Sequence, residues 1–279
     1  MSLSRRSLLI APVAAWASAA TWSKTVTTVG DSHSVSLQRT AWAGVRIEHA
    51  GATLFIDAIA PNPADGQPGP ELVAGKGRNF ALVTHHHGDH CDPKALQQVL
   101  GETGYLVYYE ESGRYIDRRI IKSEPTRLYE PVLLSRGEGE FAAFAVPASD
   151  GMGSPQVSWV IDCGGKRLIH CGDTLWHGGW WDIARAYGPF DAAFLPINGA
   201  RQVQGRYTDV GMPIVMSAEQ AAAVAQVLGT RLAIPIHYGA PPEPSYFEQP
   251  EPEQHFLAAA AARGVHTRVL RPGDSLALA

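Results

Sequence analysis

The sequence predicts an α/β sandwich built from mixed β-sheets, and three observations support this fold class. Two early strand-like segments, 44–48 and 53–57, are separated by a short turn that contains Gly51, which is typical of a hairpin. Later strand-like segments alternate with helical ones, as they do where helices cover parallel strands. Phe80–Thr84 is a nearly all-apolar run, typical of a strand buried on both faces. No clear linker interrupts the chain, so we expect one folded domain.

The helices have recognisable boundaries. Asp92 is a suitable N-cap for a helix over 93–100, which carries proline at its first position and is followed by glycine. Ser217–Gln220 has the form of a capping box and predicts a helix that ends near Gly229. A last helix is expected after a proline-rich stretch and should end at about Arg263.

The later strands are predicted from apolar and alternating segments. They are expected at Gln156–Asp162, Lys166–His170, Asp191–Ile197, Arg231–Ile236, Val265–Leu270 and Ser275–Leu278. Cys163–Gly165 separates the first two and predicts a second hairpin. Asn198–Met216 and Tyr238–Pro252 are longer than ordinary loops, and loops of that length are often functional.

Composition limits the class of function. The 279 residues are 45% hydrophobic and 18% charged, so the chain can bury a core and is not disordered. A formal net charge of −4 argues against a nucleic-acid binder that relies on a basic patch. Three cysteines without a CxxC pair do not form a disulfide framework. The eleven histidines are the unusual feature, and their positions decide their meaning.

The N-terminus has the pattern of an export signal. Ser4–Arg6 precedes the apolar run Leu8–Ala15, and Ala17–Ala19 resembles a cleavage site. Paired arginines are typical of the twin-arginine type, and the run is shorter than the roughly 20 residues that span a bilayer. We therefore expect a signal in residues 1–22, a domain over 23–279, a periplasmic location and no membrane span. A cytoplasmic protein that keeps this segment, or a first helix of the fold, is the alternative.

A cluster of metal-ligating side chains follows the buried strand 80–84. His85, His87, Asp89 and His90 lie within six residues at the carboxyl end of that strand, where α/β proteins build their sites. In a tight turn the first two can face one point and the last two another. Imidazole and carboxylate ligands suit zinc, manganese or iron.

These residues carry a family resemblance. Thr84–His90 resembles the His-x-His-x-Asp-His motif of the metallo-β-lactamase fold. Shorter likenesses to the same fold lie at Leu54–Asp57, Cys171–Thr174 and Ile236–Gly239, and Ser158–Ile161 and Phe194–Ile197 are similar to one branch of it. That branch contains the ascorbate-phosphate-lactonase-like and N-acylphosphatidylethanolamine phospholipase-D-like hydrolases. The resemblance implies a four-layer αββα sandwich of two mixed β-sheets flanked by helices.

The resemblance also implies two divalent metal ions and their ligands. His85, His87 and Asp173 would bind one ion, and Asp89, His90, Asp173 and His237 the other. Where the branch usually has Pro-Ala-x-His, this chain ends the motif on Asp150. If Asp150 is a ligand, its carboxylate favours manganese or iron over zinc. If Asp150 only forms a turn with Gly151, we expect the protein to hold a single ion.

Three functions follow for such a site. We expect a hydrolase that uses a metal-bound, bridging hydroxide against a carboxylic ester, lactone or amide in a small-molecule substrate, with Asp89 and Asp173 as proton-handling groups. A phosphodiesterase or phospholipase-D-type enzyme is the first alternative, although few basic residues (Arg201, Arg206 and Arg231) lie near the motifs. A non-catalytic metal-binding protein with a degraded first site is the second.

Other residues near the motifs are candidates for substrate contacts. Trp176, His177, Trp180 and Tyr238 are predicted to line the site, with simple packing as the alternative for each. His86 is expected to point away from the metal. Cys91 could act as a nucleophile, but the mechanism needs none, and we expect it to pack in the core.

Overall fold

The computed structural model describes residues 34–61, 69–119, 121–134, 141–203, 211–241 and 243–278. The predicted export segment, 1–22, lies outside these residues, as does Arg206. In the described part of the chain, no helix combines the length and the apolar character needed to cross a bilayer. The topology below therefore concerns the domain from residue 34 onward.

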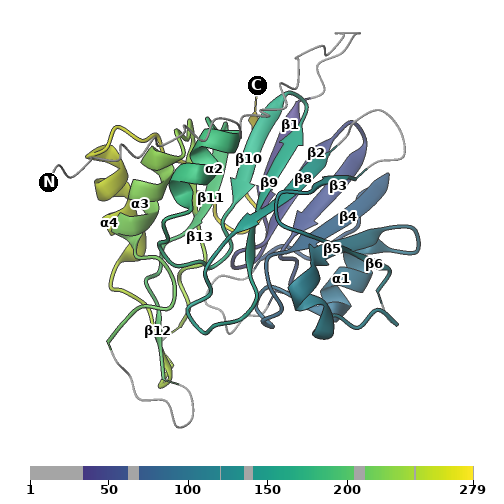
Figure 1. Ribbon diagram of the computed structural model, residues 1–279, viewed down its shortest axis with the longest axis horizontal. Coiled ribbons are helices and arrows are strands. Elements are labelled where there is room, and N and C mark those ends of the chain that lie inside the picture. The colour runs from purple at the N-terminus through teal and green to yellow at the C-terminus, as the bar shows by residue number, and fades with distance from the viewer. Residues whose placement is uncertain are drawn as a thin grey trace, which may run out of the picture. The chain divides into compact units, whose positions relative to one another are not determined.

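Two mixed sheets form the centre of this domain (Figure 1). The first has the order β15-β1-β2-β3-β4-β5-β6 and the second the order β13-β11-β10-β9-β8-β7. The strands of the first sheet are β1 (Val35–Arg39), β2 (Val45–His49), β3 (Ala52–Ile56), β4 (Arg78–Val83), β5 (Tyr105–Tyr109), β6 (Ser123–Thr126) and β15 (Ser275–Leu278). Those of the second are β7 (Pro131–Leu133), β8 (Ala142–Pro147), β9 (Val157–Cys163), β10 (Lys166–His170), β11 (Ala192–Pro196) and β13 (Ala233–Ile236).

Helices cover the outer face of each sheet. Helix α1 (Pro93–Leu100) and the 3₁₀ helix η2 (Glu110–Arg114) lie beside β4–β6, whereas α2 (Trp180–Tyr187), α3 (Ala218–Val227) and α4 (Pro252–Ala261) lie together beside the second sheet (Figure 1). One apolar cluster fills the space between the sheets and one lies under each helical layer. This arrangement confirms the αββα sandwich.

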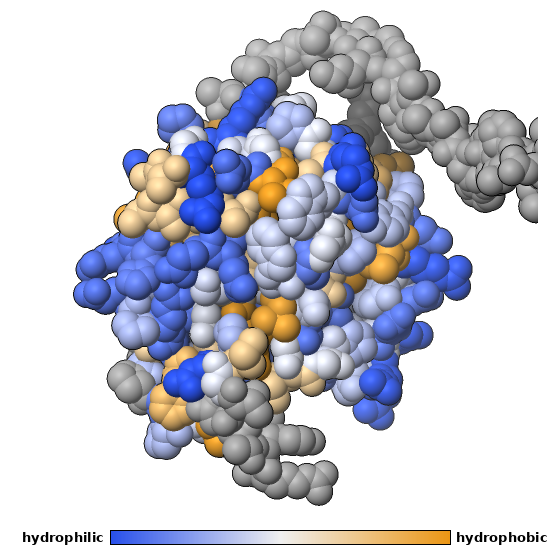
Figure 2. Space-filling view, turned by 60° about the vertical axis from the view of Figure 1, so that its left-hand side comes forward, coloured by the Kyte–Doolittle hydropathy of each residue, from blue (hydrophilic) through white to orange (hydrophobic). Residues whose placement is uncertain are grey.

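Burial of the apolar helix faces leaves a polar exterior. Figure 2 shows one face of the molecule, on which hydrophilic side chains predominate and apolar ones occur in small groups. Helix α3 shows the reason, because one face of it is buried while Glu219 remains on the outside; the buried residues are Ala218, Ala221, Ala222, Val224 and Ala225.

Both predicted hairpins are present and have the expected backbone. Ala50 and Gly51 join β2 to β3 with φ angles of 50° and 77°. Gly164 and Gly165 join β9 to β10 with φ angles of 53° and 73°. Two consecutive residues with positive φ fit the tight two-residue turns that match strand twist, and glycine adopts that conformation most easily.

The predicted strand Val265–Leu270 is wrong. Only a single bridge joins this segment to the sheet, between Thr267 and Ala233 of β13. The N–H of Ala233 donates to His266 and its carbonyl accepts from Arg268, so this side of β13 faces the segment. In a strand, the backbone N–H and carbonyl groups of every second residue point to the same neighbour. The next residue of β13 that points to this segment is Pro235, which has no N–H to continue the ladder.

The two long irregular stretches pair with each other. Residues Arg201–Gln202 form β12 and residues Tyr246–Phe247 form β14, and together they make a small antiparallel ribbon. Neither strand was expected, because two residues are too few to show a period. The sequence also did not predict β1, β5–β8 or α2, whose segments are short or weakly patterned.

The topology brings several strand ends to one edge. Strands β3 and β4 run parallel, and so do β10, β11 and β13. Strand β8 has the direction of β10, because both are antiparallel to β9. The first residue of β9, Val157, donates its N–H to the carbonyl of Thr84 at 3.0 Å, which ties the two sheets together beside the end of β4. Side chains that follow these strands therefore meet.

Candidate metal centre

The structure brings all seven predicted ligands together. They form three overlapping groups, each with potential ligand atoms within 4.8 Å of one another. The groups are His85, His90 and Asp173; His85, His87 and Asp150; and Asp89, His90 and His237. Each follows the end of a strand: the loop after β4 supplies four, and β8, β10 and β13 supply one each.

Asp173 lies between the histidines of the two halves. Its Oδ2 is 3.6 Å from His85 Nε2 and 4.0 Å from His90 Nε2. Asp89 Oδ2 has a similar position between two histidines of the cluster: it lies 3.5 Å from His90 Nε2 and 3.5 Å from His237 Nε2. These distances are too long for hydrogen bonds, but they leave room for an ion between the atoms.

Unpaired polar atoms show that the cluster fits metal ions. Both ring nitrogens of His237, His90 Nε2, Asp150 Oδ2 and Asp173 Oδ1 are buried and have no hydrogen-bond partner in the described structure. Each such atom costs about 1–3 kcal/mol if nothing satisfies it. Divalent cations would bind imidazole nitrogen and carboxylate oxygen together, so they would satisfy atoms that the protein itself leaves without partners.

The carboxylates make the centre attractive to positive charge. Burial alone would lower the pKa of His90, yet the nearby Asp89 and Asp57 carboxylates raise it to about 10. Burial would raise the pKa of Asp89, yet His90 and His237 hold it well below its usual range. A proton on His90 therefore supplies here some of the positive charge that a bound cation would bring.

Asp57 and Thr84 hold His90 in place. Asp57 is fully buried, and its Oδ2 is 2.7 Å from His90 Nδ1. The same carboxylate accepts from the backbone N–H and the hydroxyl of Thr84, both at 2.8 Å. Because Nδ1 is engaged in this way, Nε2 of His90 is free to face the centre.

Asp150 serves as both a turn residue and a potential ligand. One carboxylate oxygen accepts a short hydrogen bond from the N–H of Met152, which closes the turn. The other oxygen is unpaired and lies 3.6 Å from His87 Nε2, and the side chain is 2% exposed. The two roles use different oxygens, so they do not exclude each other.

Trp42 belongs to the site, although no pattern in the sequence pointed to it. Its indole Nε1 donates to Asp89 Oδ2 at 3.1 Å. The centroids of the Trp42 and His237 rings are 4.5 Å apart. The guanidinium of Arg39, which is fully buried, donates to the carbonyl of Trp42. Trp42 lies in a turn far from the ligand motifs in sequence, so only the folded structure shows its role.

Two of the predicted substrate residues lie in the interior instead. Trp180 is fully buried in α2 and stacks on His177 with ring centroids 4.2 Å apart. Tyr238 is 3% exposed, and its hydroxyl donates to Glu253 on α4. Neither can reach a substrate, because both side chains belong to the apolar cluster under the helical layer. Trp176 and His177 are not among the residues that line the pocket described below.

The remaining candidates near the motif have packing roles. His86 points away and stacks on Tyr115 with ring centroids 3.5 Å apart. Burial raises the pKa of the Cys91 thiol to about 12, so it is not a thiolate nucleophile at neutral pH. His170 is fully buried and binds the carbonyl of Ala43 at 2.8 Å, which makes it a core histidine.

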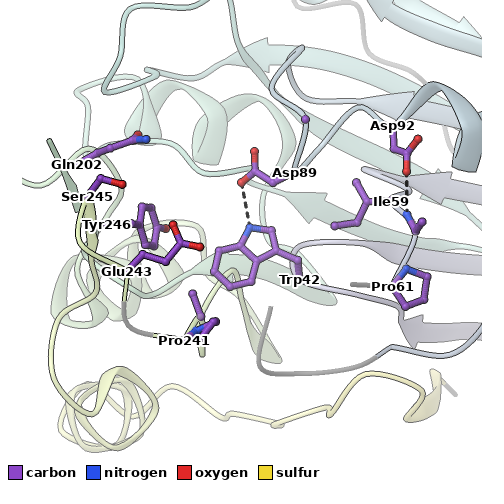
Figure 3. A pocket seen from close by; sticks show the side chains of 13 residues that line it. Trp42, Ile59, Pro61, Asp89, Asp92, Gln202, Pro241, Glu243, Ser245 and Tyr246 are labelled. Atoms are coloured by element: carbon purple, nitrogen blue, oxygen red, sulfur yellow. Dashed lines mark hydrogen bonds between the residues drawn. The ribbon is translucent and has the colours of Figure 1, made fainter. Parts of the chain in front are cut away.

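A pocket of about 570 Å³ opens on the Asp89 side of the centre. Figure 3 shows Asp89 and Trp42 on one wall, with Glu243 and Tyr246 opposite. Ile59 and Pro61 come from the loop after β3, and Gln202 comes from β12. Among the described residues that line it there is no lysine, arginine or histidine.

The fold and the site together define a class of protein. Two stacked mixed sheets between helical layers, with a histidine–aspartate cluster at the strand ends, are the metallo-β-lactamase fold. Residues 54–238 match the family model of the Beta-lactamase superfamily domain, and the chain belongs to this family.

Individual relatives agree with this assignment. A UPF0173 metal-dependent hydrolase from Pyrococcus abyssi is 30% identical over 208 residues, which are 72% of this chain and 81% of the relative. One from Thermococcus kodakarensis is 27% identical over 244 residues, 85% and 96% of the two chains. The structure of Igni18, a metallo hydrolase from Ignicoccus hospitalis, has the same fold, with a TM-score of 0.68, 20% identity and coverage of 88% and 99%. The chain is a metal-dependent hydrolase of the beta-lactamase superfamily.

Proposed function

We propose that the protein hydrolyses a carboxylic ester, a lactone or an amide at a two-metal centre. The observation that carries this proposal is the position of the ligand cluster, which borders a pocket whose described lining has no cationic side chain. Such a pocket can accept an uncharged carbonyl compound, and its described lining adds no side chain that would help the metal ions to neutralise a phosphate group.

The residues would divide between two ions. His85, His87, Asp150 and Asp173 would hold the first ion, and Asp89, His90, Asp173 and His237 the second. When bound, divalent ions at such a centre lower the pKa of water and polarise the oxygen of the bond to be broken. Zinc is compatible with the histidines, and the extra carboxylate of Asp150 favours manganese or iron.

Asp89 is suited to handle the proton of the attacking water. Its side chain is 49% exposed, whereas that of Asp173 is 12% exposed. It lines the pocket, and the indole of Trp42 fixes its orientation from one side. A carboxylate held in this way can orient a water molecule towards a substrate carbonyl and accept its proton.

Hydrolysis of phosphodiesters is less well supported. Arg231 precedes β13, at the end of that strand opposite His237, and binds Asp191 at 3.0 Å. The guanidinium of Arg201 lies over the ring of Phe247, 5.7 Å from its centroid, and Arg201 is not among the pocket residues. A degraded, non-catalytic first site is also less well supported, since the unpaired oxygen of Asp150 lies beside His87.

The test compares four classes of substrate in one assay series. Purified protein is analysed for zinc, manganese and iron and then assayed with aryl esters, lactones, amides and phosphodiesters, with and without chelator. We expect chelator-sensitive turnover of a carbonyl substrate and a loss of at least about 100-fold in kcat/KM in His87→Ala. His266→Ala is the matched control, because His266 is exposed and outside the cluster. Turnover of phosphodiesters alone, or none by metal-replete protein, would overturn the proposal.

We also propose that the protein is exported by its twin-arginine-like segment to the periplasm. The order of charges, apolar run and small residues in 1–22 supports this, and a protein that folds and takes up its metal before export suits that route. Sequencing the N-terminus of the protein from periplasmic and cytoplasmic fractions is the test. A start near residue 20 in the periplasm is expected, and retention of Met1 in the cytoplasm would contradict it.

A further inference from the structure

We infer that the pocket beside Asp89 contains a subsite for a quaternary or primary ammonium group of the substrate, formed by Trp42, Tyr246 and Glu243. This inference rests on the proposed function, because it names the charge of the substrate that this centre would hydrolyse. The residues come from two separate parts of the chain: Trp42 lies in the turn after β1, whereas Glu243 and Tyr246 lie three residues apart at the start of β14.

The geometry places two aromatic rings and one carboxylate around the same space. All three side chains line the pocket, and Figure 3 shows the Glu243 carboxylate beside the Tyr246 phenol, directed towards the side of the pocket that Trp42 forms. Asp89 lies next to Trp42 at the inner end, so a group bound here would sit next to the reacting bond. Aromatic faces together with a carboxylate are the usual surroundings of an ammonium ion in proteins.

Both rings are held in position without a ligand. The Trp42 indole is fixed by its hydrogen bond to Asp89 and its contact with His237. The Tyr246 hydroxyl accepts a hydrogen bond of 2.7 Å from Asn198, which is fully buried. Rings that are already ordered lose little conformational freedom on binding, so their attraction for a cation is not offset by an ordering cost.

Glu243 is the carboxylate that remains available. Asp92 also lines the pocket, but it caps α1 through the N–H groups of Lys94 and Ala95 and accepts from Ala60. No described residue forms a hydrogen bond or ion pair with the Glu243 carboxylate, and its side chain is exposed to the pocket and to solvent. Its charge is therefore free to pair with a ligand.

The metal centre does not reverse this preference. Its three carboxylates, on Asp89, Asp150 and Asp173, offset three of the four positive charges that two divalent ions would bring. The pocket wall adds the negative charges of Asp92 and Glu243 without a cationic residue in its described lining. The potential at the outer part of the pocket is therefore negative, which attracts a cation and repels an anion.

The test measures binding with two probes of equal size. Choline and 3,3-dimethylbutan-1-ol share a hydroxyl and a branched end, but only choline carries a positive charge. Titration calorimetry on the metal-containing protein, at one fixed ionic strength, gives both Kd values without any turnover. We expect choline to bind at least about tenfold more tightly than the neutral alcohol, since a carboxylate and two rings face its charge.

Two variants locate the preference. Glu243→Gln keeps the shape of the side chain and should reduce the ratio of the two Kd values to about threefold or less. Tyr246→Leu should also reduce this ratio, because it removes one aromatic ring. Glu124→Gln is the control, because Glu124 is exposed on β6 and outside the pocket. Two results would overturn the subsite: equal affinities for both probes in the wild type, or the wild-type ratio of Kd values in Glu243→Gln. Selective binding of choline without hydrolysis of any carbonyl substrate would instead contradict the proposed reaction and still support the subsite.

Discussion

At the scale of single residues, Asp150 is where this chain departs from the Pro-Ala-x-His motif of the branch that it resembles. A carboxylate takes the position expected for a histidine, and the turn that it closes leaves one oxygen directed towards His87. The next residue, Gly151, packs tightly against another loop, since a Cβ at this position would lie 2.3 Å from the Ile214 carbonyl oxygen, so the turn requires glycine here.

Substitution of Asp150 tests this ligand. Asp150→Ala is expected to lose about one metal equivalent per chain, whereas Asp150→His should keep two and shift the preference towards zinc. Metal content is measured by elemental analysis after equilibration with equal zinc and manganese. Asp117→Ala is the control, because Asp117 pairs with Arg119 on the surface. Unchanged occupancy of both sites in Asp150→Ala would show that Asp150 is not a ligand.

At the scale of elements, one polar cluster ties α4 to the segment after β13. Glu253 of α4 accepts from the Tyr238 hydroxyl at 2.8 Å and from Arg271 at 2.6 and 3.0 Å. Arg39 lies over the Tyr238 ring, 4.8 Å from its centroid, and also holds the carbonyl of Trp42. The cluster therefore anchors the residue next to His237, a predicted ligand, and explains why Tyr238 is turned away from the pocket.

The charge of Glu253 should make this anchoring depend on pH. Burial would raise its pKa, but hydrogen bonds from Arg271 and Tyr238 hold it below the ordinary value of 4.5. A carboxyl with a depressed pKa stabilises the fold above its unfolded pKa, and the gain is lost as the pH falls through the folded value. We expect Glu253→Gln to lower the free energy of unfolding by about 1 kcal/mol at pH 7 and by little below pH 4.

Urea denaturation at pH 7, 5 and 3.5 measures this difference. Glu251→Gln is the control at the N-cap of the same helix, because the Glu251 side chain makes no capping hydrogen bond. A Glu253→Gln variant that is as stable as the wild type at pH 7, or equally destabilised at every pH, would contradict the assigned role.

At the scale of the whole molecule, the metal centre joins the two sheets. His85, His87, Asp89 and His90 follow a strand of the first sheet, and Asp150, Asp173 and His237 follow strands of the second. An ion that binds ligands from both halves cross-links them, and it binds the folded chain far better than the unfolded one. Metal binding should therefore stabilise the sandwich as a whole.

Removal of the metal tests this cross-link. An ion present at 100 times its Kd contributes about 2.7 kcal/mol, so chelation should lower the Tm by about 5–10 °C, and adding the metal back should restore it. Scanning calorimetry with parallel metal analysis measures the change, and His87→Ala should show a smaller effect of chelator. An unchanged Tm in protein shown to be free of metal would contradict a joining role.

Local patterns in the sequence were sufficient for part of the fold. Helix α1 and strand β10 have the predicted bounds, because Asp92 and Pro93 start the helix and a pair of glycines precedes the strand. The segment 265–270 has the same alternation as a true strand, but Pro235 on its neighbour prevents a ladder. Whether a strand forms depends on its partner, which a local pattern does not contain.

By itself, the sequence determined the chemical class of this protein. Four potential ligands within six residues after a buried strand, together with short motifs at Asp173 and His237, are enough to predict a metal-dependent hydrolase, because ligand type and spacing are local properties. Only the tertiary structure decided what surrounds the centre. The strand ends of two sheets share one edge, and this brings together Trp42, Glu243 and Tyr246. The folded structure also buries Trp180 and Tyr238, because those side chains face the helical layer. Contacts between distant segments depend on the packing of whole sheets, and no single stretch of sequence encodes them.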